Sequence, residues 1–193
     1  MIVYCDGSQY KNTLILSYGV LLHKGEEYPI EISGFHKIPR NMLSYHEEVA
    51  FVEALLLLKR ENISYKNVSF YSDSENIINA GFWLEKNNYT SEKKVFIENI
   101  MKKVLNFLDQ SDMLDEVLDC LKNSRFQKVK SHSKNTSIDN IRVDYLSKNA
   151  QKNERLSYQQ FLACSFETFD KKGIPILSNL PFMPQDKTNK IRV

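Results

Sequence analysis

One helix pattern between two short strand patterns restricts the fold of this chain more than any other feature. From Glu47 to Lys59 the residues are apolar or strongly helix-forming, and the apolar side chains recur at the spacing of a single helix face. A β-prone run precedes this segment at residues 2–5, and another follows it at residues 68–72. A helix of this length is the kind of connection that parallel strands require. The sequence therefore predicts an α/β sheet in which the two runs are parallel neighbours.

Both β-prone runs stop at an aspartate, Asp6 in the first and Asp73 in the second. Parallel strands bring their carboxyl ends to the same edge of a sheet, where open α/β folds form their sites. Glu47 begins the apolar stripe of the intervening helix. An acid on a buried helix face is costly unless a cation compensates its charge, and a metal ion is the natural candidate.

Each acidic motif also has an ordinary structural interpretation. Asp-Gly-Ser after residue 5 is a common turn sequence, Asp73 can cap a helix, and Glu47 can be a first-turn acid favoured by the helix dipole. The order of the motifs favours a site instead. A strand Asp, a helix Glu and a second strand Asp are followed by a Lys-Ser-His segment ending at His132 and by a helix pattern that carries Asp144.

The remaining patterns fit one mixed sheet with helices on its faces. Three strands with short links come first and suggest an antiparallel meander, after which helices alternate with two further strands. We expect a mixed five-stranded α/β sheet in which strands 1–3 are antiparallel and strands 4 and 5 run parallel to strand 1. The expected strands are residues 1–6, 13–23, 29–37, 67–73 and 125–131, and the expected helices are residues 44–60, 75–85, 92–109, 112–122 and 137–151.

The pattern divides the chain into a domain of residues 1–150 and a C-terminal extension of residues 151–193. A capping box begins at Ser157 and precedes an aromatic stripe ending near Gly173, which predicts a short amphipathic helix. Prolines beyond it favour extended backbone. We expect the extension to pack on its own domain, and docking to a protein partner or to nucleic acid is the alternative.

Composition narrows the class of protein. The 193 residues carry a net charge of +2, from 26 Lys and Arg against 24 Asp and Glu, which is not the charge of a generic polyanion binder. A local basic run from Lys122 to Lys134 contains no acid. This run could face the phosphates of a nucleic acid, or it could be a solvated strand edge and loop. Three cysteines without CxxC spacing indicate a reducing compartment. We expect a cytoplasmic protein with no membrane-spanning segment.

Together these motifs resemble the ribonuclease H family, over about residues 1–150. Residues 6–8 are similar to the first-strand Asp-Gly-Ser of the bacterial type 1 enzymes, and Tyr-Gly at residues 18–19 follows at the family's spacing. Glu47 has Ala three residues later and Ala-Leu seven and eight residues later, as the family's helix glutamate does. Glu48 lacks this pattern but remains the fallback, because apolar residues also share its face.

The second half of the resemblance has matches and departures. Asp73 is similar to the family's second strand aspartate, Val-Lys-Ser-His at residues 129–132 resembles its Val-Lys-Gly-His, and an Asn-x-x-x-Asp-x-Leu helix contains Asp144. The glycine-rich turn after strand 1 is absent, although Asn12 keeps the place of a substrate-contacting asparagine. Ser44 stands where the family has part of an Asn-Asn pair before the helix.

The resemblance implies a ribonuclease H-like endonuclease that cuts the RNA strand of RNA/DNA hybrids, with Asn12 and Ser44 contacting the substrate. Two divalent ions about 4 Å apart can drive such hydrolysis, and oxygen-only ligands favour Mg²⁺, with Mn²⁺ as a substitute. The implied assignment has Asp6 bridging both ions, Glu47 and Asp73 holding one, and Asp144 helping to hold the other. His132 would transfer a proton or aid product release.

Other functions on the same fold stay open. A proofreading exonuclease typically has Asp-x-Glu on strand 1, where this chain has Ser8, and a transposase or integrase usually ends in a helical Glu instead of Asp144. A catalytically silent module that docks in a nucleoprotein complex is the remaining alternative. Retention of all four acids argues against that module, because idle clustered carboxylates would repel one another without a metal.

Overall fold

A five-stranded mixed sheet forms the centre of the computed structural model, which describes residues 1–10, 13–85, 92–129, 137–152 and 155–163. Its strand order is β3-β2-β1-β4-β5. β1 pairs antiparallel with β2 and parallel with β4, β2 pairs antiparallel with β3, and β4 pairs parallel with β5. The predicted α/β sheet and its strand directions are confirmed. The strands are β1 (Ile2–Gln9), β2 (Ile15–His23), β3 (Ile30–Lys37), β4 (Ser69–Ser72) and β5 (Arg125–Lys128).

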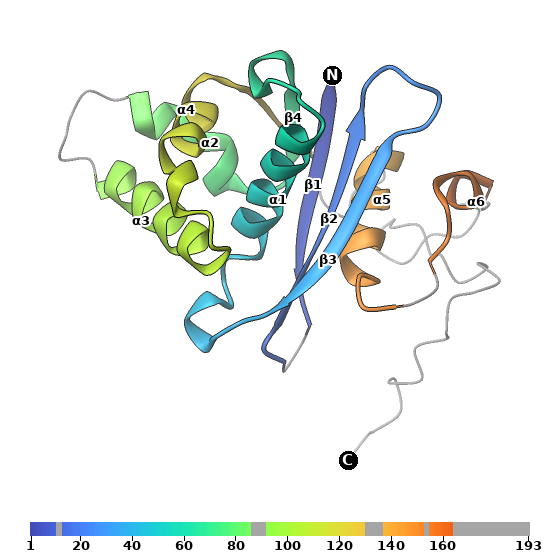
Figure 1. Cartoon of the computed structure of the whole chain (residues 1–193), viewed down its shortest axis with the longest axis horizontal. Coiled ribbons are helices and arrows are strands. Elements are labelled where there is room, and N and C mark those ends of the chain that lie inside the picture. The colour runs from blue at the N-terminus through green and yellow to red at the C-terminus, as the bar shows by residue number, and fades with distance from the viewer. Residues whose placement is uncertain (11–12, 86–91, 130–136, 153–154, 164–193) are drawn as a thin grey trace.

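Helices cover both faces of the sheet (Figure 1). Four of them, α1 to α4, lie on one side, and α5 and α6 lie on the other. Within the described ranges, no helix combines the length and the apolar character that crossing a membrane requires. The bounds are α1 (His46–Arg60), α2 (Glu75–Glu85), α3 (Glu92–Phe107), α4 (Leu114–Asn123), α5 (Ile138–Lys148) and α6 (Tyr158–Ala163), with short 3-10 turns η1 (Arg40–Met42), η2 (Tyr65–Asn67) and η3 (Ser111–Met113).

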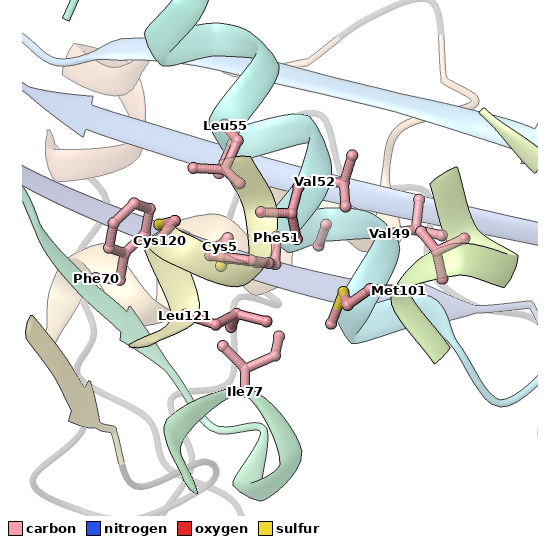
Figure 2. Close-up of a cluster of buried hydrophobic side chains, with 14 of the residues drawn as sticks. Cys5, Val49, Phe51, Val52, Leu55, Phe70, Ile77, Met101, Cys120 and Leu121 are labelled. Carbon is pink, nitrogen blue, oxygen red and sulfur yellow. The ribbon is translucent and has the colours of Figure 1, made fainter. Parts of the chain in front are cut away.

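The main core lies between the sheet and helices α1 to α4 (Figure 2). Phe51 of α1 is fully buried, and its ring centroid lies 5.6 Å from that of Phe70 in β4 and 5.8 Å from that of Phe126 in β5. Burying such a side chain contributes about 1.5–3 kcal/mol. Ile77 of α2 and Leu121 of α4 join the same cluster. This packing fixes α1 against β1 and β4, and therefore sets the position of its first turn.

β1 is longer than the sequence predicted. The expected strand stopped at Asp6, but the observed strand continues to Gln9 because residues 7–9 pair with residues 16–18 of β2. The antiparallel neighbour supplies backbone partners that a turn would have replaced, so the turn interpretation of Asp-Gly-Ser is wrong. Asp6 consequently lies inside the central strand of the sheet.

A buried arginine fastens α5 to the opposite face of the sheet. Arg142 is 1% exposed and donates two hydrogen bonds to Glu31 of β3, at 2.6 and 2.7 Å, and one to the carbonyl of Leu156, at 2.8 Å. Its guanidinium lies 5.1 Å from the ring centroid of Tyr145 and 4.9 Å from that of Phe161. Residues 155–163 of the extension therefore contact α5, while residues 164–193 lie outside the described part of the chain.

Candidate metal centre

Three carboxylates meet at one end of the sheet. Single oxygen atoms of Asp6, Glu47 and Asp73 all lie within 4.8 Å of one another. Asp6 comes from β1, Asp73 directly follows the parallel neighbour β4, and Glu47 lies in the first turn of α1. The structure thus brings together three of the four predicted metal ligands, at the sheet edge that the sequence indicated.

α1 can approach β1 because residue 7 is glycine. A Cβ atom at Gly7 would lie 2.1 Å from the carbonyl oxygen of His46 and 2.8 Å from the backbone nitrogen of Glu47. The Gly7 N–H donates to Glu47 Oε2 at 3.3 Å, and His46 Nδ1 lies 3.2 Å from Glu47 Oε1. Both carboxylate oxygens of Glu47 therefore have a partner that orients them, in a helix turn where the dipole favours an anion.

The segment after β4 places the Asp73 side chain in the cluster. The Ser74 N–H donates to Ser72 Oγ at 3.1 Å, and Ser74 Oγ accepts from the N–H of Ile77 at 3.4 Å. Ser74 is therefore the residue that caps α2. Because the cap belongs to Ser74, the Asp73 carboxylate is left to face Asp6 and Glu47.

Glu48, the fallback for the helix ligand, lies in a different environment. It is 2% exposed and accepts a hydrogen bond of 3.2 Å from Asn76 Nδ2 of α2. Burial raises the pKa of Glu48, while its hydrogen bonds act in the opposite direction. Glu48 is not in the carboxylate cluster, so the helix register presents Glu47 to the site.

α5 brings Asp144 and Ser147 to the other side of Asp6. The Asp144 carboxylate is not part of the three-residue cluster, and it forms an ion pair with Lys148 Nζ at 2.6 Å. Ser147 is fully buried, and its hydroxyl donates to Asp6 Oδ2 at 2.7 Å. Sequence reasoning selected Asp144 and missed Ser147. The signal for Ser147 is its i, i+3 spacing from Asp144, which carries little weight until the helix orientation is known.

The environment of the site disfavours charge on two of its acids, Asp6 and Glu47. Burial raises the pKa of Asp6 well above its usual range, the charges of Glu47 and Asp144 raise it further, and the hydrogen bond from Ser147 lowers it. Burial also raises the pKa of Glu47, against the lowering effect of His46. The hydrogen bond to Glu47 in turn raises the pKa of His46. Partly buried, mutually repelling carboxylates with oxygen-only donors fit a hard divalent cation such as Mg²⁺.

The other predicted site residues are less informative. Ser44 is exposed in the turn that precedes α1. Asn12 and His132 lie outside the described residues, as does the whole Lys-Ser-His segment, residues 130–132. Lys128 of the basic run forms an ion pair with Glu75 at the surface. In the structure the charge of this lysine is therefore paired with an acid of α2.

Comparison with known proteins identifies the family. The RNase H family model matches residues 1–152. Among solved structures, RNase H1 from the halophilic archaeon Halobacterium salinarum NRC-1 has 17% identity and a TM-score of 0.49, over 77% of this chain and 95% of that one. LC11-RNase H1, solved in complex with RNA/DNA hybrid, has 18% identity and a TM-score of 0.49, over 77% of this chain and 94% of that one. No curated protein sequence matches the chain. Because the family match spans most of its length, the chain belongs to the ribonuclease H family.

Proposed function

We propose that this protein is a metal-dependent endonuclease that hydrolyses the RNA strand of RNA/DNA hybrids and leaves 5′-phosphate and 3′-hydroxyl ends. One observation supports the proposal beyond family membership, namely the gathering of Asp6, Glu47 and Asp73 oxygens within 4.8 Å. Clustered, partly buried carboxylates repel one another, and a divalent cation offsets that repulsion. A silent module would retain this cost without a compensating function.

In this proposal Asp6, Glu47 and Asp73 would hold one Mg²⁺, and Asp6 and Asp144 would help to hold a second, with Mn²⁺ as a substitute. Bound cations would activate water, neutralise charge on the phosphoryl oxygens and assist the leaving oxygen. The protein's own part is to orient the ligands before the metal arrives. Gly7 and His46 do so for Glu47. Asp144 is paired with Lys148 in the structure and would have to give up that ion pair to hold a cation.

Proton transfer or product release is assigned to His132, and the support for this role is the Val-Lys-Ser-His motif. Selection of the hybrid requires recognition of groove shape and 2′-hydroxyl groups, for which we propose Asn12 and Ser44 as contacts. Ser44 is exposed just ahead of α1, which carries Glu47, and this location suits a substrate contact. We also propose a cytoplasmic location, and docking of the extension to a protein partner stays the alternative to its packing on the domain.

Four matched substrates test the function: an RNA/DNA hybrid, double-stranded RNA, single-stranded RNA and double-stranded DNA, each with Mg²⁺, Ca²⁺ or chelator. We expect internal cleavage of the RNA strand of the hybrid with Mg²⁺ alone, and loss of that cleavage in Asp73→Asn. Comparable cleavage of double-stranded DNA would place the protein in another nuclease class. Metal binding without cleavage of any substrate would favour the silent module.

A further inference from the structure

A buried hydroxyl lies against the central acid of the site. Ser147 is 0% exposed, and its Oγ is 2.7 Å from Asp6 Oδ2 and 3.0 Å from the backbone carbonyl oxygen of Asp144. The hydroxyl has one hydrogen, and the carboxylate oxygen of Asp6, at the shorter distance, is the better-placed acceptor. Ser147 therefore donates to Asp6, and the Asp144 carbonyl is the secondary partner.

The position of α5 makes this contact possible. Gly19 pairs with Asp6 across the sheet, and a Cβ at Gly19 would lie 2.4 Å from the Val143 carbonyl oxygen and 2.9 Å from the Ser147 nitrogen. α5 thus packs directly on the strand next to Asp6. The bidentate contact of Arg142 with Glu31 holds the same helix at β3. The donor is consequently placed by the backbone of α5 and not by a flexible side chain.

A neutral donor suits this position better than a cation would. Hydrogen bonding to one oxygen restricts rotation of the Asp6 carboxylate, so its orientation is set before any ligand arrives. Lys148, which pairs with Asp144 at 2.6 Å, supplies a positive charge that a metal must displace. Ser147 supplies no charge, and therefore orients Asp6 without competing with a cation.

We propose that Ser147 is a positioning residue for metal binding, which holds the Asp6 carboxylate in the orientation that the metal requires. Through this bond α5, the helix that carries Asp144, is mechanically joined to the ligand on β1. The inference rests on the proposed metal-dependent function and adds a residue to it that the acidic motifs do not contain.

The test compares Ser147→Ala with Ser17→Ala. Ser17 is also 0% exposed, but its hydroxyl donates to the backbone carbonyl of Ser8 at 3.2 Å and contacts no carboxylate of the site. Mg²⁺ and Mn²⁺ affinities of the substrate-free proteins are measured by calorimetry. We expect Ser147→Ala to weaken metal binding by about 10- to 100-fold, the usual effect of losing a residue that orients a ligand. We expect Ser17→Ala to bind metal as the wild type does.

Cleavage assays provide a second readout. For Ser147→Ala the Mg²⁺ concentration that gives half-maximal rate should rise by the same factor, while KM for the hybrid at saturating Mg²⁺ stays unchanged. Ser147→Cys retains a weak donor and should fall between wild type and Ser147→Ala. Melting temperatures measured in chelator show whether each variant is folded.

The outcomes separate this inference from the proposed function. Wild-type metal affinity in Ser147→Ala, or an equal loss in Ser17→Ala, would overturn the positioning role. A wild-type protein that binds metal but cuts no hybrid would overturn the proposed function, and calorimetry would still decide the role of Ser147. A wild-type protein that binds no divalent cation would overturn both.

Discussion

Gly7→Ala is the substitution whose effect on the site follows most directly from the geometry. The added Cβ would lie 2.1 Å from the His46 carbonyl oxygen, whereas ordinary contacts begin at 3.4 Å, so the first turn of α1 must move by about 1.3 Å. The clashing atoms of His46 and Glu47 belong to the backbone, so a change of side-chain rotamer cannot relieve the clash. Since a misplacement of about 1 Å can cost about 10²-fold in rate, we expect kcat/KM for hybrid cleavage to fall by at least that factor.

Gly25→Ala is the matched control for this experiment. Gly25 has φ +92°, which strains an alanine by about 1–2 kcal/mol, yet no atom lies within 4 Å of its added Cβ. Its turn follows His23, which pairs with Ile2 at the opposite end of β1 from Gly7. The control should lose thermal stability but keep its rate per folded molecule. Wild-type cleavage and metal affinity in Gly7→Ala would refute the reasoning that residue 7 sets the position of Glu47.

Three further perturbations test the site and its support. Glu47→Gln should reduce Mg²⁺-dependent cleavage by about 10²-fold or more while Glu48→Gln stays near wild type, and a reversed order in steady-state assays would refute the helix register. The raised pKa of Asp6 means that its contribution to stability is present at low pH and is lost as pH rises through the folded-state value. In chelator, urea unfolding should therefore show Asp6→Asn gaining stability relative to wild type as pH rises from about 4, whereas a pH-independent difference would contradict the cause assigned to the shift. Glu31→Gln leaves Arg142 buried without its counter-charge and should lower the free energy of unfolding by about 3 kcal/mol. This value is the low end of the range for breaking a buried ion pair, because the Glu31 side chain is 19% exposed. A loss below about 1 kcal/mol, measured by urea unfolding, would contradict a buried ion pair.

The elements that the sequence predicted well are those encoded by local patterns. The apolar stripe of α1 and the β-prone runs of β1 and β4 are each contained in a few consecutive residues, and the parallel pairing follows from the helix between them. The end of β1 was missed because it depends on pairing with residues 16–18 of β2, which no pattern inside residues 6–9 reveals.

Burial alone would have selected Glu48, the helix acid that lies outside the carboxylate cluster. Glu48 is 2% exposed, whereas the Glu47 side chain is 15% exposed. Asn76 compensates Glu48 from α2, and that partner is visible only after the two helices are packed. The family spacing after Glu47 pointed to the acid that lies in the carboxylate cluster, because that spacing reflects the whole site. Ser147 was missed for the same physical reason, since its partner Asp6 is 141 positions away in the chain.

The contact between Arg142 and the extension shows that the family similarity and the packed structure end at different residues. Recognisable similarity to the family stops at residue 152, yet Arg142 uses the Leu156 carbonyl as an acceptor, and Tyr145 packs with the fully buried Phe161. A fragment that ends at residue 152 would expose apolar surface on α5. It would also remove one hydrogen-bond acceptor from the buried Arg142 guanidinium, whose Nη1 has no acceptor among the described residues. The smallest fragment that keeps these buried groups satisfied therefore extends at least through α6, so sequence similarity underestimates the length of the folding unit.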